Sequence, residues 1–193
     1  MENMDQAKLN LPEKLSIREL QNNLLNAQNS IGYFFKSIPE ETFFSKPDGG
    51  WSPAENVRHL TTATFTTGLF IKKELHFLLN LFGKGNSLKN LHQVRDEYLE
   101  KLSSGKKASG IFIPISLSFF RTKEWQQKEC EALEFSIQQI VGVLDHWTEE
   151  ELDTTNIIHP ILGIITVREI LYFSLYHLYH HSSIVEKRLG INK

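Results

Sequence analysis

The stretch Ser52-Pro-Ala-Glu-Asn-Val-Arg-His-Leu60 decides the fold, because it contains a complete helix start. Ser52 and Glu55 match the capping box, in which a hydroxyl and a carboxylate satisfy the free backbone donors of a helix N-terminus reciprocally. Pro53 takes the first helical position, where its missing N–H costs nothing. Apolar residues then recur at spacings of three and four. The sequence therefore predicts a helix over about 52–82, ended by Gly83.

Two further capping boxes lie on either side of this stretch, at Ser16-Ile-Arg-Glu19 and Thr166-Val-Arg-Glu169. Each opens a segment with the same apolar spacing, which predicts helices over 16–37 and 166–189. Another helix is expected over about 121–147, where apolar residues again follow the helical repeat.

The connection over 83–117 is long, and a short helix is expected inside it at about 88–102. Strand signals are weak, and no second-domain boundary is visible. We therefore predict an all-α fold, a four-helix bundle with one long crossover between helices two and three. Residues 1–193 would form a single domain, in which residues 1–15 are an N-terminal extension. The crossover permits helices two and three to run parallel, with the last helix antiparallel to helix two.

Composition excludes several partners. Of the 193 residues, 40% are hydrophobic and 23% are charged, with a formal net charge of -2. Nucleic acids and anionic membranes require a basic footprint, so we expect neither as a partner. No apolar run approaches the roughly 20 residues that span a bilayer. The polar N-terminus and the single cysteine, Cys130, favour a cytoplasmic protein.

His177 and His181 are the strongest chemical signal, because residues four apart share one face of a helix. A third imidazole from another helix would complete a facial set of metal ligands with open positions for water or substrate. His59 is the candidate. It lies seven residues after Ser52, and His181 lies eight before Leu189, so in antiparallel helices both would lie about 10–12 Å from the same bundle end.

The residues alone leave other interpretations open. His59 lies about 100° from the main apolar stripe of its helix, and a lone inward histidine is more often a hydrogen-bonded core residue than a ligand. His180 points about 100° from His181 and is not expected to be a ligand. His159 is interpreted as a turn residue or pocket lining. Cys130 lies on a core stripe, where a free thiol is inert.

Three blocks of sequence carry a resemblance. Residues 50–60 resemble the W-S-x-x-E-x-x-x-H-L opening of helix two in DinB-like (YfiT-related) proteins. Residues 159–169, from His159-Pro160 to Glu169, resemble the turn before their last helix. The segment Tyr176-His177-Leu-Tyr-His180-His181 resembles that helix's H-x-x-x-H pair. The order and separation of the blocks match over roughly residues 16–190.

This resemblance implies a four-helix bundle with an up-down-down-up course and a divalent metal, usually nickel or zinc. Carried over position by position, the implied ligands are His59, His177 and His181. Similar proteins include S-transferases that use low-molecular-weight thiols such as bacillithiol or mycothiol, and others described as metal-dependent hydrolases. Many form homodimers. The apolar circumference of helix two, including Phe65 and Leu69, also favours a homodimer here, with packing of this helix under the crossover as the alternative.

One departure from the family pattern concerns the end of the last motif. Relatives often continue it as H-H-x-G-Q-I, whereas this chain reads His180-His181-Ser-Ser-Ile184, so the glutamine is replaced by Ile184. The leading hypothesis is a metal-dependent thiol S-transferase acting on a small-molecule substrate, with no catalytic side chain assigned. The alternatives are a metal-dependent hydrolase and a non-catalytic metal-binding or stress-response module.

Overall fold

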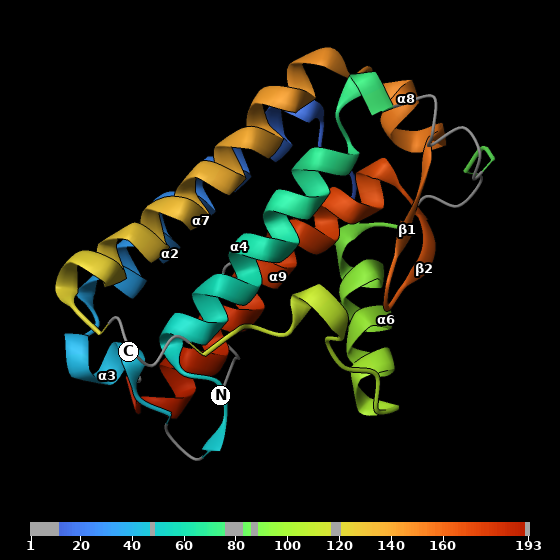
Figure 1. Ribbon diagram of the computed structural model, residues 1–193. Helices are drawn as coiled ribbons and strands as arrows, with labels where there is room; N and C mark the ends of the chain where they lie inside the picture. The colour runs from blue at the N-terminus through green and yellow to red at the C-terminus, as the bar shows by residue number, and fades with distance from the viewer. Residues whose placement is uncertain (1–11, 47–48, 76–82, 86–88, 117–120, 192–193) are drawn as a thin grey trace.

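The protein is mostly helical, with one small sheet (Figure 1). The structure is a computed structural model and describes residues 12–46, 49–75, 83–85, 89–116 and 121–191. The long helices are α2 (Ile17–Ser37), α4 (Pro53–Phe70), α7 (Lys123–Val143) and α9 (Val167–Arg188). Shorter helical segments are α3 (Glu40–Phe44), η2 (Lys73–Leu75), α6 (Leu91–Ser103), η4 (Gly110–Phe112), η5 (Leu144–His146) and α8 (Glu149–Thr154). The expectation of a predominantly helical fold is confirmed.

The four long helices pack against one another through their apolar faces. α2 contacts α7 and α9, and α4 contacts the same two helices. Figure 1 shows α2 beside α7, with α4 running in front of α9. Leu24, Leu60, Ile140 and Leu175 each contribute a fully buried side chain from a different long helix. This shared core fixes the position of α4 against α9, which is the contact that forms the site.

All three capping boxes are confirmed. In each, the hydroxyl accepts from the backbone N–H three residues on, and the glutamate accepts from the cap's own N–H. The box that opens α4 is buried, and Lys46 lies 2.7 Å from Glu55. This local signal fixes where α2, α4 and α9 begin.

The expected helix over 52–82 does not continue beyond Phe70. α4 ends at Phe70, and the fully buried Ile71 is its C-terminal cap. The Ile71 carbonyl accepts a hydrogen bond of 2.9 Å from the indole N–H of Trp147, so it is held by a tertiary contact at the point where the helix stops. The remainder of the expected helix, over 76–82, lies outside the described residues. The expected helix over 121–147 likewise ends early, because α7 stops at Val143 and η5 follows.

A two-stranded antiparallel hairpin corrects the expectation of a purely helical fold. β1 (Asn156–His159) pairs with β2 (Gly163–Thr166), and His159 lies opposite Gly163. Gly163 adopts a φ of 77°, a left-handed conformation that glycine accepts without strain. Both strands contact α9, and the connecting turn follows His159. The segment expected to be a turn is therefore a complete hairpin that brings His159 to the last helix.

None of the helices among the described residues is both long and apolar enough to cross a lipid bilayer.

Candidate metal centre

Three histidines from two helices converge between α4 and α9. His59 belongs to α4, and His177 and His181 lie one turn apart on α9. All three are at least 94% buried. One ring nitrogen of each lies within 4.8 Å of the corresponding nitrogen of the other two. The structure thus brings together the three side chains that the sequence singled out, and His59 faces α9 although it lies off the main apolar stripe.

The proton on the His59 ring is fixed by the backbone of the crossover. His59 Nδ1 lies 2.7 Å from the carbonyl oxygen of Phe112, in η4. A carbonyl can only accept, so Nδ1 carries the hydrogen and the neutral ring has an unprotonated Nε2. That Nε2 lies 3.1 Å from His177 Nε2. His59 Nε2 therefore accepts a hydrogen bond from His177 Nε2–H, and its lone pair is directed toward His177.

The His181 ring is oriented in the same way by Asn56, one turn before His59 on α4. His181 Nδ1 lies 2.8 Å from Asn56 Oδ1. The amide nitrogen of Asn56 donates to the carbonyls of Ser52 and Trp51, at 2.9 and 3.3 Å, so the oxygen must face the histidine. His181 then donates from Nδ1 and keeps Nε2 free. An outer hydrogen bond of this kind is typical of a metal-binding histidine.

The environment keeps all three imidazoles uncharged. Burial lowers the pKa of His59, and the hydrogen bond to Phe112 opposes only part of that shift. Burial, together with the repulsion that protonated rings in this cluster would exert on each other, holds the pKa of His177 and of His181 well below 6.5. Neutral imidazole is the form that binds metal ions. Three uncharged, preoriented donors therefore fit a divalent cation such as zinc.

The triad forms part of the wall of a cavity of about 800 Å³. Its other walls are largely apolar and come from α4, the crossover, the hairpin and α9. Ala63 and Phe70, which share a helix face with His59, are among them. No aspartate or glutamate lines this cavity within the part of the chain that the structure describes. A bound cation would thus face an apolar chamber large enough for a small molecule.

His180 lies beside the triad but outside it. Its side chain reaches the cavity, and its Nδ1 is 3.2 Å from the hydroxyl of Tyr176. The cluster of described residues that could hold a metal ion includes His181 and not His180. The two neighbouring histidines on α9 therefore have different surroundings, which makes His180 a useful control.

Two partners of the triad were not anticipated from the sequence. Asn56 precedes His59 by three residues, so helical spacing alone would have placed both on one face of α4. The Phe112 carbonyl carries no sequence signal, because any residue at that position supplies a backbone oxygen. Its role depends on the path of the crossover.

Cys130 is buried in α7, 1% exposed, and burial raises the pKa of its thiol to about 12. We expect the folded protein to show almost no reaction with Ellman's reagent at pH 8, and one thiol per chain to react in guanidinium chloride. Stoichiometric reaction of the native protein at the rate of a free thiol would contradict the structure. The contrast would confirm that any thiol chemistry uses an external thiol.

The family model of the DinB superfamily matches residues 23–185. The chain belongs to the DinB superfamily. The match spans all three blocks of sequence that carry the resemblance, and it includes His59, His177 and His181. No curated protein matches the chain, and no solved structure does.

Proposed function

We propose that this DinB-superfamily protein binds a divalent cation, zinc or nickel, through His59, His177 and His181, and acts as a thiol S-transferase. The observation that carries the proposal is the convergence of three buried, uncharged imidazoles in the wall of one cavity. Three protein ligands leave coordination positions open, as in catalytic rather than structural sites. A low-molecular-weight thiol and a small electrophile would be the substrates.

A bound cation would stabilise the thiolate form of a coordinated thiol, because positive charge favours the deprotonated sulfur. The side chains of this protein have complementary tasks. Phe112 and Asn56 hold the rings of His59 and His181 with their free nitrogens facing the site. The largely apolar walls would accommodate an apolar electrophile. In the overall reaction a carbon–sulfur bond forms, the leaving group departs with its bonding electrons, and the thiol proton passes to solvent.

The cavity favours thiol transfer over hydrolysis. Metal-dependent hydrolysis commonly uses a carboxylate as a general base beside the metal-bound water. None of the described cavity residues is an aspartate or a glutamate, and Glu55 is occupied by the α4 cap and Lys46. A thiol that ionises at neutral pH beside a cation has less need of a base. Hydrolysis is the alternative reaction at the same site.

Ile184 favours a second candidate function, a metal-binding or stress-response module without turnover. It lies in the cavity wall one turn beyond His180, where relatives often carry glutamine. An isoleucine cannot hydrogen-bond to a ligand or substrate. If an amide at this position is needed for the reaction, the metal site would remain while catalysis is lost.

The proposal is tested on protein purified without an affinity tag and loaded with zinc or nickel. Conjugation of 1-chloro-2,4-dinitrobenzene to cysteine, glutathione or 2-mercaptoethanol is followed by absorbance, with His177→Ala as the inactive control. Metal-dependent conjugation that is lost in the variant supports the S-transferase. Hydrolysis of 4-nitrophenyl acetate without thiol conjugation would support the hydrolase. Bound metal with neither activity would favour the binding module.

Asn56 provides a separate test of the ligand set. We expect Asn56→Leu, which removes the acceptor for His181, to weaken zinc binding by about 10- to 100-fold. Asn56→Asp keeps an oxygen at this position, so its zinc affinity is expected to fall much less. Competition against a chromophoric chelator gives both affinities. An Asn56→Leu protein that binds zinc like the parent would show that the His181–Asn56 contact has no part in the site.

We further infer that α2, α4, α7 and α9 form an up-down-down-up four-helix bundle, supported by the contacts of α2 and α4 with both α7 and α9.

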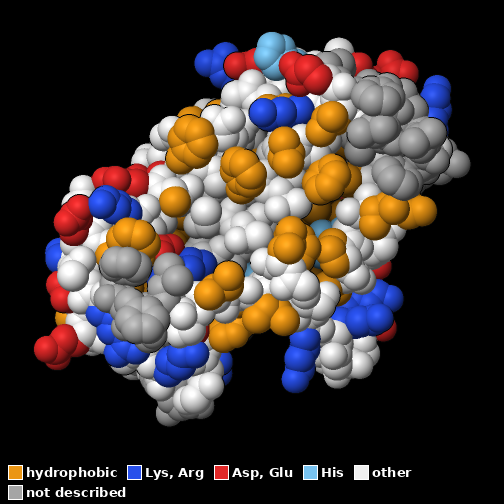
Figure 2. Space-filling view, viewed as in Figure 1, with side chains coloured by type: hydrophobic (Ala, Val, Ile, Leu, Met, Phe, Trp, Pro, Cys, Tyr) orange, Lys and Arg blue, Asp and Glu red, His pale blue; other side chains and the backbone are white. Residues whose placement is uncertain are grey.

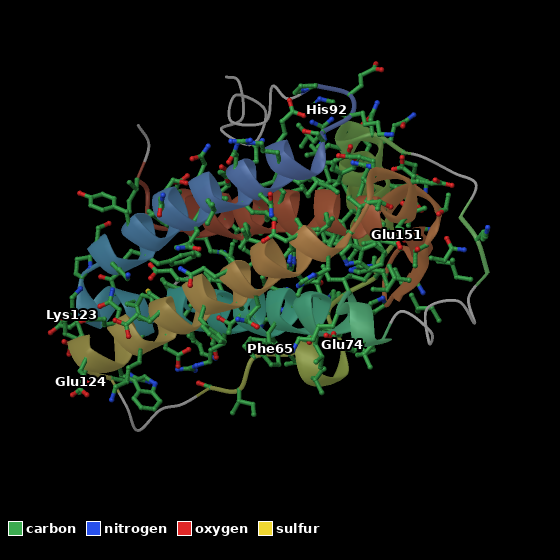
Figure 3. All side chains as sticks on the ribbon, turned by 90° about the horizontal axis from the view of Figure 1, so that it is seen from above. Phe65, Glu74, His92, Lys123, Glu124 and Glu151 are labelled. Carbon is green, nitrogen blue, oxygen red and sulfur yellow. The ribbon has the colours of Figure 1, made fainter. Side chains whose placement is uncertain are left out.

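A homodimer is also proposed, through the outward face of α4. Phe65 is 50% exposed and Leu69 is 42% exposed. Figure 3 shows Phe65 on the side of α4 that faces away from α2 and α9. Hydrophobic side chains are spread over the face on which α4 and α7 lie (Figure 2). Light scattering should give about twice the chain mass of 22.3 kDa, and Phe65→Ser should shift it toward the monomer. A monomeric parent at micromolar concentration would contradict the dimer.

A further inference from the structure

His159 is a fourth histidine of the cavity, and its ring is held by the turn that follows it. It is the last residue of β1 and is half-buried. Its Nδ1 lies 3.2 Å from the backbone nitrogen of Ile161 and 3.0 Å from that of Leu162. Backbone N–H groups only donate, so Nδ1 accepts both hydrogen bonds and carries no proton. In the neutral ring the hydrogen is therefore on Nε2.

The ring remains neutral at physiological pH, because burial lowers the pKa of His159 to about 4. Among the described residues, no side chain or backbone group forms a hydrogen bond with its Nε2. The backbone thus holds one edge of the ring and leaves a single N–H donor on the other. A donor fixed in this way cannot act as a general base, since its only other nitrogen is already occupied.

His159 is close to the metal candidate, separated from it by one aromatic ring. The ring centroids of His159 and Phe173 are 4.3 Å apart, and Phe173 stacks on His177 at 4.7 Å. All three side chains line the same cavity. The N–H donor of His159 and the triad therefore belong to one chamber.

The surroundings of His159 are apolar. Ile157, Ile161 and Ile170 line this end of the cavity with Phe173. Two cationic side chains line the same cavity, Lys107 from the crossover and Arg188, which lies about 22 Å farther along α9 than Phe173 at 1.5 Å per residue. Tyr98, whose ring centroid lies 5.0 Å from that of Phe173, also lines this cavity. A mainly apolar pocket with neutral donors suits an uncharged molecule that carries an acceptor, such as a carbonyl or nitro oxygen.

We propose that His159 binds the acceptor atom of an uncharged, mainly apolar substrate through its Nε2–H, and so positions that substrate beside the triad. The assignment of this substrate as the electrophile of thiol transfer rests on the proposed function. The predicted hydrogen bond from His159 is independent of that function, because it follows from the turn geometry of His159 and from the walls of the cavity.

The test compares two ligands of similar size. Acetophenone carries a carbonyl acceptor, and isopropylbenzene replaces it with a hydrocarbon group. His159→Asn is the informative variant, because an asparagine oxygen can replace Nδ1 as acceptor for Ile161 and Leu162 but supplies no donor at the Nε2 position. His180→Asn is the matched control on α9. Binding is followed by ligand-observed and imidazole ¹H–¹⁵N NMR of the metal-loaded protein.

We expect the spectrum of the unmodified protein to show His159 as the Nε2–H form, with a signal that acetophenone shifts and isopropylbenzene does not. His159→Asn should weaken acetophenone binding by roughly 2- to 10-fold and leave isopropylbenzene binding unchanged. His180→Asn should preserve both affinities. An Nδ1–H ring, or equal loss of both ligands in His159→Asn, would overturn the proposal.

The spectrum of the unmodified protein decides the tautomer even if the variant does not fold. The two proposals also fail separately. If His159 binds acetophenone and no thiol is transferred, the S-transferase proposal fails alone. If thiol transfer occurs and His159→Asn leaves the KM for a carbonyl- or nitro-bearing electrophile unchanged, the assignment of His159 fails alone.

Discussion

Replacing His177 with alanine is expected to abolish stoichiometric metal binding. The parent, purified without a tag, should hold about one divalent ion per chain after loading. His177 is 4% exposed and forms ring contacts with both His59 and His181, at centroid distances of 4.9 and 4.6 Å. Its removal leaves only two nitrogen ligands. Metal affinity should therefore fall by more than the roughly 10- to 100-fold that follows removal of a hydrogen-bond partner of a ligand. Equilibrium dialysis with metal analysis measures it.

His180→Ala is the matched control for that experiment, because His180 is on the same helix and in the same cavity but outside the triad. It should retain the metal. Zinc should also raise the melting temperature of the parent and of His180→Ala, since a ligand at 100 times its Kd stabilises the folded state by about 2.7 kcal/mol. His177→Ala should show no such shift. Equal binding by His177→Ala and the parent would contradict the assigned ligands.

Arg168→Met is expected to lower the free energy of unfolding by about 3 kcal/mol, because it breaks a buried ion-pair network. The guanidinium is 2% exposed and lies 2.6 Å from both Glu149 Oε2 and the Leu15 carbonyl. It also pairs with Asp153. Without Arg168, Asp153 and the Leu15 carbonyl lose a buried partner, whereas the half-exposed Glu149 can regain water. The melting temperature should fall by roughly 6–12 °C.

The same network predicts the acid dependence of stability. Burial raises the pKa of Asp153 and of Glu149, but hydrogen bonds and charge from Arg168 and their other donors outweigh it and lower both pKa values. A carboxyl whose pKa is lowered by folding stabilises the protein above about pH 5, and this contribution is lost as the pH falls through the folded-state pKa. Chemical denaturation from pH 7 to 3 should therefore show a steeper loss in the parent than in Arg168→Met.

A double-mutant cycle with Asp153→Asn isolates the Arg168–Asp153 pair. The two substitutions should be less than additive, since either one already removes the interaction. Additive losses, or an Arg168→Met protein as stable as the parent at pH 7, would show that the network contributes little to stability.

Helix starts were predictable because their signals are local. Ser16, Ser52 and Thr166 cap α2, α4 and α9 as their sequences indicate. The early end of α4 was not predictable, because the hydrogen bond from Trp147 to Ile71 joins residues 76 positions apart. The hairpin was missed for a related reason. Its short strands contact α9, and this support cannot be inferred from strand propensity alone.

In the candidate site, too, local features were predictable from the sequence and long-range ones were not. Four-residue spacing predicts that His177 and His181 share a face of α9, and the structure agrees. The rotation of His59 could not be decided from a helical wheel, because it depends on where the crossover places the Phe112 carbonyl. The family resemblance supplied that third residue. The orientation of His59 is determined by a contact between distant segments, which the local sequence pattern does not reveal.

The most direct test of the central claim is a crystal structure of the zinc-loaded, tag-free protein with anomalous diffraction at the zinc edge. We expect one anomalous peak between α4 and α9, about 2.0–2.1 Å from a ring nitrogen of each of His59, His177 and His181. A zinc ion bound elsewhere, or one that leaves any of these three rings uncoordinated, would contradict it.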